Sequence, residues 1–358
     1  MWGSQLAERS EFDVATSTGD YRVSLGSGQL AQAVGNADVI LVDASLAHLL
    51  PSSAERVITI DSTEESKTLT GCEQVILELR SAGVRRGHRL LAVGGGIVQD
   101  VATFVADVYM RGLAWSYAPT TLMAMADSCI GGKSSINVGE VKNLVGGIYP
   151  PQQVYIDPVF LDTLSPAALG SGFSEAAKIA FCRGPGTFNE YLRRYAAFDT
   201  DPIALISHVL SAKKWFVEID EHDKLERRLL NFGHTFGHAL ESAVNHALPH
   251  GLGVSVGVLC ASAHPDASNS EPVQALRDHC LHLLEMAPDV VEDALAQFDR
   301  QRYERAFRSD KKHSDGFFHL ILPQGDSVAE VRISANTGWD SILAATNSTI
   351  DVVRSHVR

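Results

Sequence analysis

Three histidines stand at intervals that suit metal binding or proton transfer. In the stretch NFGHTFGHALESAVNHALPHG, residues 231–251, His234 and His238 are four positions apart and His250 follows twelve positions later. Side chains four positions apart lie on one face of a helix, so the first two would be neighbours. A neutral imidazole binds zinc well, and a catalytic zinc ion commonly has three protein ligands. The spacing therefore admits a metal site, although a single helical histidine is more often structural.

A carboxylate would complete such a site, and two glutamates compete for the position. Glu175, in GFSEAAKIA, lies on a predicted helix that carries Lys178 one turn later. Glu241 is the rival, because it shares a helix face with His238. The zinc-peptidase motif HExxH is absent, since Thr235 stands where its glutamate would be. The residues alone leave both carboxylates open.

A glycine-rich turn, VGGGIVQD at residues 93–100, joins a predicted strand to a predicted helix. Glycines there would let backbone N–H groups approach a phosphate at the helix N-terminus. The dinucleotide fingerprint GxGxxG is absent, so the alternative is a tight structural turn. Asp43, which ends the strand VILVD, is placed where an acidic group accepts hydrogen bonds from a ribose.

A long polar segment, YAPTTLMAMADSCIGGKSSINVGEVKNLVGG, covers residues 117–147. Segments of this kind inside a domain are usually functional. Lys133 and Lys142 stand among glycines and small residues here, and Arg111 precedes them in YMRG. Together these cations could hold a phosphate, whereas each alone would be an ordinary surface charge.

Strand and helix patterns alternate in the N-terminal part of the chain. The predicted strands are Val39–Asp43, Arg56–Asp61, Arg89–Gly94, Trp115–Pro119 and Val154–Asp157, with helices at Cys72–Ala82 and Val98–Met110. This alternation predicts a mostly parallel sheet with covering helices, that is, an α/β domain. We expect it to span residues 1–165.

Helical patterns dominate after Ser165. The predicted helices are Pro166–Cys182, Pro185–Ala196, Pro202–Glu218, Arg227–Asn245, Leu252–Ala263, Val273–Met286, Val290–Phe298 and Gly338–Val353, interrupted by a hairpin at Phe317–Leu322 and Ser327–Ile333. We therefore expect a second, largely helical domain at residues 166–358. A cleft between two domains is a usual place for a ligand.

The composition of the 358 residues excludes several classes of protein. The net charge of −13 disfavours nucleic acid and anionic membranes as partners. No apolar run is long enough for a transmembrane helix, and the N-terminus lacks the plan of a signal peptide. The five cysteines are scattered without a CxxC motif, which indicates a reducing cytoplasm and no disulfide framework.

Seven blocks of sequence together resemble one enzyme family. GGGIVQD, YMRG, PTTLMAMADSCIGGKSSIN, KNLVG, SEAAK, NFGHTFGH and HG occur in the order and spacing of 3-dehydroquinate synthase and the wider sugar phosphate cyclases. The resemblance runs from about Asp43 to Lys312. It implies a Rossmann-like nucleotide-binding domain followed by a helical metal- and substrate-binding domain, with NAD and zinc or cobalt as cofactors.

The resemblance also implies a role for individual positions. The metal ligands would be Glu175, His234 and His250. The NAD contacts would be Asp43, Glu64, Lys67, Gly94, Gly95, Asp100, Thr120, Thr121, Phe160 and Thr163. The substrate pocket would contain Arg111, Lys142, Asn143, Lys213, Asp223, Arg227 and Asn231, and the catalytic positions would be His238, Lys178, Lys133 and Asp127. In such enzymes Arg111 reaches the neighbouring subunit, which implies a homodimer.

Enzymes of this family oxidise a ring alcohol with NAD, eliminate phosphate, reduce the ketone again and close a carbocycle by an intramolecular aldol step. Some positions depart from the family pattern: Leu252 replaces a common glutamate in HGLG, and Asp223 stands where glutamate is usual. Lys213 and Arg227 match the positions that grip a substrate carboxylate. We therefore expect a heptulosonate phosphate as substrate, with a specialised cyclase of secondary metabolism as the main alternative. A metal- and NAD-dependent polyol dehydrogenase and a non-catalytic relative are further alternatives.

Overall fold

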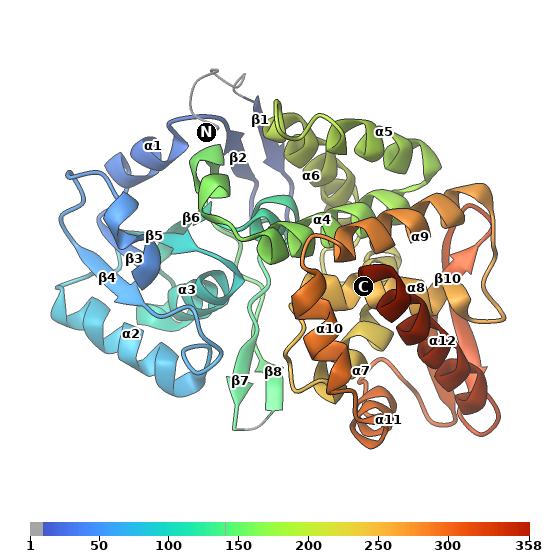
Figure 1. Cartoon of the computed structure of the whole chain (residues 1–358). Helices are drawn as coiled ribbons and strands as arrows, with labels where there is room; N and C mark the ends of the chain where they lie inside the picture. Colours follow the sequence, from blue (N-terminus) through green and yellow to red (C-terminus); the bar gives the residue numbers. More distant parts are fainter. Residues whose placement is uncertain (1–9, 140) are drawn as a thin grey trace. The chain divides into compact units, whose positions relative to one another are not determined.

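The computed structural model describes residues 10–139 and 141–358 (Figure 1). The chain divides into two compact units. The first contains the described residues up to Thr163 together with Ala196–Glu221, and the second contains Leu164–Tyr195 and His222–Arg358. The sequence-based boundary after residue 165 lies beside the first crossing between the units. Residues 196–221, which that boundary assigns to the second domain, group with the first unit.

A seven-stranded sheet forms the centre of the first unit, in the order β1-β2-β9-β6-β5-β3-β4. Its strands are β1 (Ser10–Val14), β2 (Tyr21–Leu25), β3 (Val39–Asp43), β4 (Val57–Ile60), β5 (Arg89–Gly94), β6 (Ala114–Pro119) and β9 (Gln153–Ile156). Only the β1–β2 pair is antiparallel. The predicted mostly parallel sheet is therefore confirmed, and β1 and β2 are additions that the sequence analysis did not contain.

The central strands are parallel, and the crossover connections that parallel strands need leave both of their faces buried. Val39–Val42 and Leu90–Val93 are buried throughout, which is why these strands read as continuous apolar runs. The chain runs from β3 outward to β4 and then from β5 through β6 to β9 on the other side. The direction therefore reverses between β3 and β5, and ligands of open α/β sheets bind at such a point, outside the carboxyl ends of the strands.

Helices and short loops complete the first unit. They are α1 (Gln29–Gly35), α2 (Leu69–Ser81), α3 (Gly96–Val108), α6 (Pro202–Ile219) and the short turns η1 (Ala44–Leu49), η2 (Tyr109–Arg111), η3 (Ala124–Ser128) and η4 (Pro158–Thr163). Within the predicted polar segment the chain forms a two-stranded ribbon, β7 (Ile136–Val138) and β8 (Val141–Val145). Figure 1 shows this ribbon apart from the main sheet.

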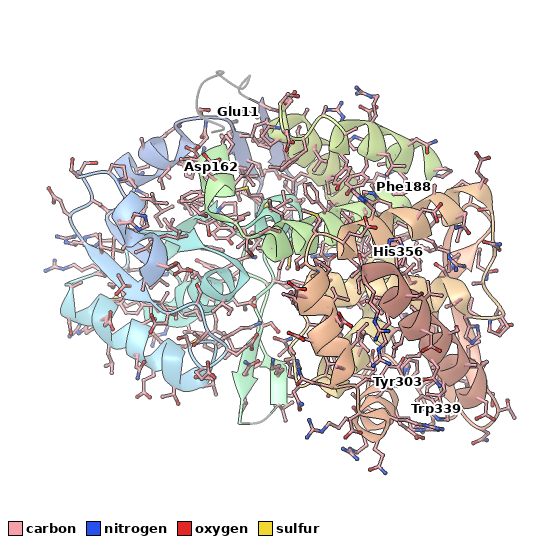
Figure 2. All side chains as sticks on the ribbon, in the orientation of Figure 1. Glu11, Asp162, Phe188, Tyr303, Trp339 and His356 are labelled. Atoms are coloured by element: carbon pink, nitrogen blue, oxygen red, sulfur yellow. The ribbon has the colours of Figure 1, made fainter. Side chains whose placement is uncertain are left out.

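The second unit is largely helical, as predicted. It contains α4 (Pro166–Arg183), α5 (Pro185–Tyr195), η5 (Glu226–Asn231), α7 (His234–Ala243), α8 (His250–Ala263), α9 (Glu271–Leu284), α10 (Pro288–Ala296), α11 (Arg300–Arg308) and α12 (Trp339–Val357). The predicted hairpin is present as β10 (Phe317–Gln324) and β11 (Ser327–Ser334). Aromatic side chains join its last helices: the rings of Tyr303 and Trp339, labelled in Figure 2, lie 6.3 Å apart.

One predicted helix is wrong: Arg227–Asn245 is not continuous. The chain forms the short turn η5, leaves helical geometry at Phe232, and begins α7 at His234. Gly233 between them has a φ of 77°, in the left-handed region that glycine tolerates best. A Cβ atom at this position would lie 2.7 Å from Val258 Cγ2 and 2.9 Å from the Val254 carbonyl oxygen. Gly233 therefore allows the start of α7 to approach α8 closely.

Replacing Gly233 by alanine is expected to lower the free energy of unfolding by about 1–3 kcal/mol, because the variant combines a left-handed backbone with overpacking. Denaturant unfolding would measure the change. Gly186→Ala is the matched control, since a Cβ atom there meets nothing within 4 Å. Wild-type stability in Gly233→Ala would show that the close approach of α7 to α8 is not needed.

Among the helices of the described residues, none is both long enough and apolar enough to cross a membrane. The five cysteines are all buried and none forms a disulfide.

Candidate active site

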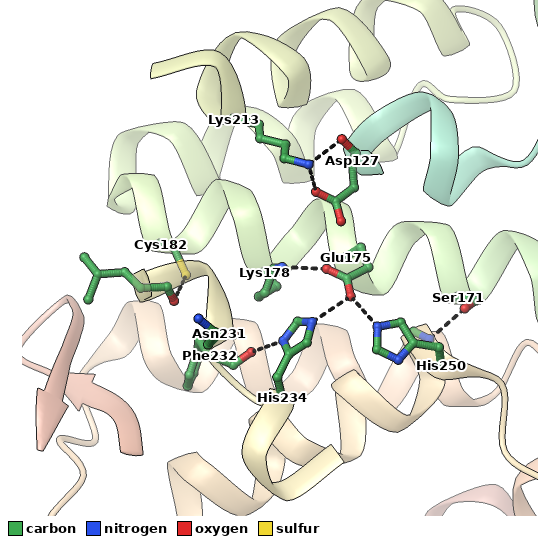
Figure 3. Close-up of polar contacts among 12 residues, drawn as sticks. Asp127, Ser171, Glu175, Lys178, Cys182, Lys213, Asn231, Phe232, His234 and His250 are labelled. Carbon is green, nitrogen blue, oxygen red and sulfur yellow. Dashed lines mark hydrogen bonds and ion pairs between the residues drawn. The ribbon is translucent and has the colours of Figure 1, made fainter. Parts of the chain in front are cut away.

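Two histidine side chains of the second unit converge on one carboxylate oxygen of Glu175 (Figure 3). Glu175 Oε1 lies 3.3 Å from His234 Nε2 and 3.2 Å from His250 Nε2. The three residues come from three elements: Glu175 from the middle of α4, and the histidines from the first positions of α7 and α8. These residues are the predicted metal ligands, and the structure brings their ligating atoms together.

The separations suit a tetrahedral metal ion. Ligand atoms about 2.0–2.1 Å from a tetrahedral zinc ion lie about 3.3–3.4 Å from each other. The two distances from Glu175 Oε1, 3.3 and 3.2 Å, are close to this edge length. One carboxylate and two imidazoles also form a donor set that zinc or cobalt accepts. The residues present therefore fit a divalent metal ion.

Both histidines are oriented through their other ring nitrogen. His234 Nδ1 lies 3.2 Å from the carbonyl oxygen of Phe232, and His250 Nδ1 lies 2.8 Å from Glu241 Oε1. Hydrogen bonds of this kind fix the tautomer of a metal-binding histidine and leave Nε2 available as the ligand. Glu241, the rival carboxylate in the sequence, thus contacts the side of the His250 ring away from the nitrogen that faces Glu175. Its position is that of an orienting group.

Close helix packing explains the glycine after His250. A Cβ atom on Gly251 would lie 2.0 Å from the Ser171 carbonyl oxygen, so only glycine lets α8 approach α4 this closely. The Gly251 amide donates to Ser171 Oγ at 2.8 Å, which fixes the contact. The pair His250–Gly251 therefore serves both to supply an imidazole and to bring it beside Glu175.

The buried carboxylate is balanced by cations. Glu175 is 1% exposed, and its Oε2 forms an ion pair of 2.6 Å with Lys178 Nζ, also on α4. Burial alone would raise the pKa of Glu175, but Lys178 and the two imidazoles outweigh it and hold the pKa well below the usual range. Burial opposes the charge of His250 too, yet hydrogen bonds to Glu175 and Glu241 raise its pKa to about 10. The Glu175 carboxylate is thus held ionised, as a metal ligand must be, whereas burial lowers the pKa of His234 and favours its neutral imidazole.

His238 is the third imidazole of this cluster. Its ring centroid lies 5.2 Å from that of His234 and 5.4 Å from that of His250. The three histidines can place one nitrogen each within 4.8 Å of one another, so His238 is a rival ligand by proximity. Its side chain is exposed, in contrast to the buried Glu175. The predicted same-face relation of His234 and His238 is confirmed, and their division of roles remains a prediction.

The predicted cofactor residues of the first unit gather at the carboxyl ends of neighbouring strands. Asp43 ends β3, Gly94 ends β5, and Thr120 follows β6, where its amide donates to the Gly94 carbonyl at 3.0 Å. Gly95 is the N-cap of α3, so amide groups at the start of this helix face the end of the sheet. This edge includes the reversal of strand order between β3 and β5.

Three further predicted cofactor positions lie in the segments that follow β6 and β9. Thr121 follows Thr120, and its Oγ1 accepts a hydrogen bond from Ala124 N at 3.2 Å. Phe160 and Thr163 lie in η4 after β9, where Thr163 Oγ1 donates to the Phe160 carbonyl at 2.6 Å. The Phe160 side chain is fully buried, so an NAD contact at this position would have to use its backbone.

Lys67 and Asp100 form a shielded ion pair in the first unit. Lys67 Nζ lies 2.7 Å from Asp100 Oδ2, and their side chains are 11% and 19% exposed. Burial raises the pKa of Asp100 to about 6, although the Lys67 ammonium acts to lower it. Glu64, a third predicted cofactor contact, accepts a hydrogen bond of 2.8 Å from Asn137 Nδ2.

The predicted substrate and catalytic residues of the first unit fall into two groups. Lys213, on α6, is 6% exposed and forms an ion pair with Asp127 of η3. Arg111, Lys133 and Lys142 are exposed. Arg111 has a left-handed φ of 64° at the end of η2. The structure therefore pairs Lys213 with Asp127 and leaves the cations of the polar segment on the surface.

The predicted substrate residues of the second unit lie in and before η5. Asp223 has a left-handed φ of 57°, and Arg227 is 4% exposed, a rare degree of burial for an arginine. Asn231 Nδ2 donates to the Arg228 carbonyl at 3.0 Å. Asn231 also lines a small pocket with Arg228, Thr235, Lys312, His319, Ile321 and Glu330.

Lys312 is a pocket residue that the sequence analysis did not single out. It follows α11 and forms an ion pair of 2.8 Å with Asp310, beside Asn231 in the same pocket. The only signal in the sequence was the pair Lys311–Lys312 after an aspartate, which reads as a solvated charge run.

The two family models and a curated relative that match this chain name the same enzyme family. The model of the 3-dehydroquinate synthase N-terminal part matches residues 57–171, and the model of the C-terminal part matches residues 172–313. The 3-dehydroquinate synthase of Koribacter versatilis (strain Ellin345) is 33% identical over 347 residues, covering 89% of this chain and 93% of that protein.

Two solved structures share the fold. The valiolone-forming enzyme ValA (2-epi-5-epi-valiolone synthase) from Streptomyces hygroscopicus subsp. jinggangensis 5008, with NAD+ and Zn2+ bound, has a TM-score of 0.78 at 23% identity and covers 94% of this chain and 99% of its own. A 2-deoxy-scyllo-inosose synthase complexed with carbaglucose-6-phosphate, NAD+ and Co2+ has a TM-score of 0.72 at 21% identity, covering 97% and 99%. Because the two family models together extend over residues 57–313 and a relative 33% identical aligns over 89% of the sequence, the chain belongs to the 3-dehydroquinate synthase family.

Proposed function

We propose that this protein is a sugar phosphate cyclase that converts a seven-carbon heptulosonate phosphate into a carbocycle of the 3-dehydroquinate type, with loss of phosphate. We further propose NAD and a divalent metal ion, zinc or cobalt, as its cofactors. The observation that carries the proposal is the convergence of Glu175, His234 and His250 at 3.2–3.3 Å in a chain of this family. Relatives with this fold hold NAD+ together with Zn2+ or Co2+.

NAD supplies a temporary hydride acceptor, and the metal ion supplies a Lewis acid for the oxygen of the carbon that is oxidised. The carboxyl ends of β3 and β5 would receive the dinucleotide, with Asp43 near a ribose and the amides after Gly94 near the phosphates. His238, exposed beside the two ligand histidines, is positioned to move a proton. The exposed Lys142 would attract the substrate phosphate.

The overall reaction needs no external oxidant, because the hydride removed from the ring carbon is returned to it. The carbon–oxygen bond to phosphate breaks, and a new carbon–carbon bond closes the carbocycle. The departing phosphate can carry away the proton released during elimination, so no further basic residue is required. We also propose a homodimer, in which the exposed Arg111 would serve the neighbouring subunit.

Phosphate release across a panel of seven-carbon sugar phosphates, with and without a carboxylate, tests this function. A cyclase releases inorganic phosphate without accumulating NADH. A polyol dehydrogenase would accumulate NADH without phosphate, and a non-catalytic relative would yield neither. Preference for a neutral heptulose phosphate would favour the specialised-cyclase alternative over the heptulosonate substrate.

Replacing Arg227 by methionine tests the substrate carboxylate. A guanidinium can grip a carboxylate through two hydrogen bonds, and loss of a desolvated partner costs about 2–5 kcal/mol. We therefore expect kcat/KM for a heptulosonate phosphate to fall by roughly thirty-fold or more, with a small effect on a neutral heptulose phosphate.

Arg228→Met is the matched control for this measurement. Arg228 is the next residue, but its side chain is 38% exposed and forms an ion pair with Glu330 at 2.7 Å. Its loss should change kcat/KM by only a few-fold, because exposed ion pairs contribute little. An equal loss on both substrates in Arg227→Met would argue against a carboxylate at this position.

A further inference from the structure

Two of the proposed substrate residues lie on β8, the exposed strand of the ribbon, whereas Ile136 and Asn137 of β7 are buried. All five residues of β8, including Lys142 and Asn143, are exposed. Asn143 also has a left-handed φ of 57°, which costs free energy for a residue with a Cβ atom. Something other than an apolar core must therefore fix the geometry of these side chains. Polar contacts from neighbouring loops fix that geometry.

Asn137, in β7, is the centre of these contacts. Its side chain is 5% exposed, and both ends of its amide are used. Nδ2 donates to Glu64 Oε2 at 2.8 Å, and Oδ1 accepts from the Asn143 amide at 2.9 Å. Its own backbone amide donates to the Lys67 carbonyl at 2.9 Å. One buried side chain thus joins the loop after β4 to the strand that presents Asn143.

A second set of contacts runs parallel to the first. Lys67 Nζ lies 2.7 Å from Asp100 Oδ2 and donates to Asn143 Oδ1 at 2.9 Å. Lys142 Nζ lies 4.0 Å from Glu64 Oε2, the oxygen that accepts from Asn137. Each of the two ribbon residues therefore contacts a residue that we assign to NAD.

We propose that Asn137 is a positioning residue that couples occupation of the NAD site to the geometry of Lys142 and Asn143. This inference rests on the proposed function. NAD contacts to Glu64, Lys67 and Asp100 would fix the loop to which Asn137 is bonded, and Asn137 would transmit that order to β8. Cofactor binding then raises the affinity for the phosphorylated substrate. By linkage, substrate raises the affinity for NAD by the same factor.

Binding measurements on the metal-loaded protein test the coupling. The probes are NAD and a carbocyclic phosphonate analogue of a heptulosonate phosphate, which can neither lose phosphate nor open its ring. In the wild-type protein we expect each probe to tighten the Kd of the other by about tenfold, within the usual range for coupled sites. In Asn137→Ala this factor should fall below about threefold. A merely structural role would weaken both Kd values and leave their coupling factor unchanged.

Two further variants sharpen the test. Asn137→Asp keeps the size of the side chain and an acceptor for the Asn143 amide but puts a carboxylate against Glu64, so it should also lose coupling, and it replaces Asn137→Ala if that variant fails to fold. Ser134→Ala is the control: Ser134 Oγ accepts from the Gly147 amide at 3.0 Å, in the same segment but outside the Asn137 contacts. It should keep the wild-type coupling factor.

The outcomes separate this inference from the proposed function. Loss of coupling in both Asn137 variants with retention in Ser134→Ala supports the inference. Full coupling in an Asn137 variant, or its loss in all variants alike, overturns the inference alone. The inference also fails if the wild-type protein binds both probes independently, while the proposed function stands. A wild-type protein that binds neither probe refutes both.

Discussion

The His250→Ala variant is expected to lose its metal ion and its cyclase activity together, while NAD binding stays close to that of the wild-type protein. His250 Nε2 lies 3.2 Å from Glu175 Oε1, a separation that suits two ligands of one metal ion. Removing one of three protein ligands leaves two, which is too few for a catalytic zinc site. The NAD contacts that we propose all lie in the other compact unit, so they should not depend on this side chain.

Elemental analysis of the purified variant, with NAD titration and phosphate release on the same preparation, checks this expectation. His246→Ala is the control, because His246 is an exposed histidine in the turn that follows α7. It should retain both metal and turnover. Full metal content in His250→Ala would refute the assignment, and Glu241 and His246 would then have to be examined as ligands.

The sequence predicts best where burial makes the pattern of apolar residues unambiguous. β3 and β5 are buried on both faces, so Val39–Val42 and Leu90–Val93 stand out as continuous apolar runs. β1 and β2 lack such runs, because polar side chains such as Asp13 and Arg22 alternate with apolar ones and pair across the strands at 3.0 Å. Their formation depends on pairing with the sheet, which a local pattern does not encode.

The sequence analysis did not predict the ribbon of β7 and β8, for a related reason. β8 is exposed along its whole length, so its residues VKNLV carry no burial pattern. Helical periodicity predicted too much before α7: the apolar spacing continues through Phe232, where the backbone leaves helical geometry, and through Gly233, whose left-handed φ precedes the new helix. The close contact of Gly233 with Val254 and Val258 of α8 favours this break, and a tertiary contact of this kind is not visible in a local pattern.

The candidate site shows what spacing alone leaves undecided. His234 and His238 share a helix face, as their four-residue interval predicts. Sequence spacing could not decide whether Glu175 or Glu241 completes the metal site, because both glutamates lie on predicted helices. The structure separates them by geometry: Glu175 Oε1 faces Nε2 of two histidines, whereas Glu241 contacts Nδ1 of His250. That distinction depends on how α4 packs against α8.

Replacing His238 by alanine is expected to leave the metal content unchanged and to lower turnover by about 10²–10⁴-fold, the usual loss for a positioned proton-transfer group. His238 belongs to the same face of α7 as His234, and its ring lies 5.2 Å from that ring. Its exposed side chain can reach a bound molecule, whereas Glu175, the proposed ligand carboxylate, is buried. The effect should fall mainly on kcat, because proton transfer occurs in the transition state.

His234→Ala provides the contrast that assigns the two histidines. Both variants remove one imidazole from the same face of α7. If His234 is a ligand and His238 moves a proton, only His234→Ala should come out of purification without metal. A metal-free His238→Ala variant would make both histidines ligands and would leave Glu175 as a carboxylate that orients them. The three imidazoles that approach within 4.8 Å make that outcome physically reasonable, so elemental analysis of the pair decides between two concrete arrangements.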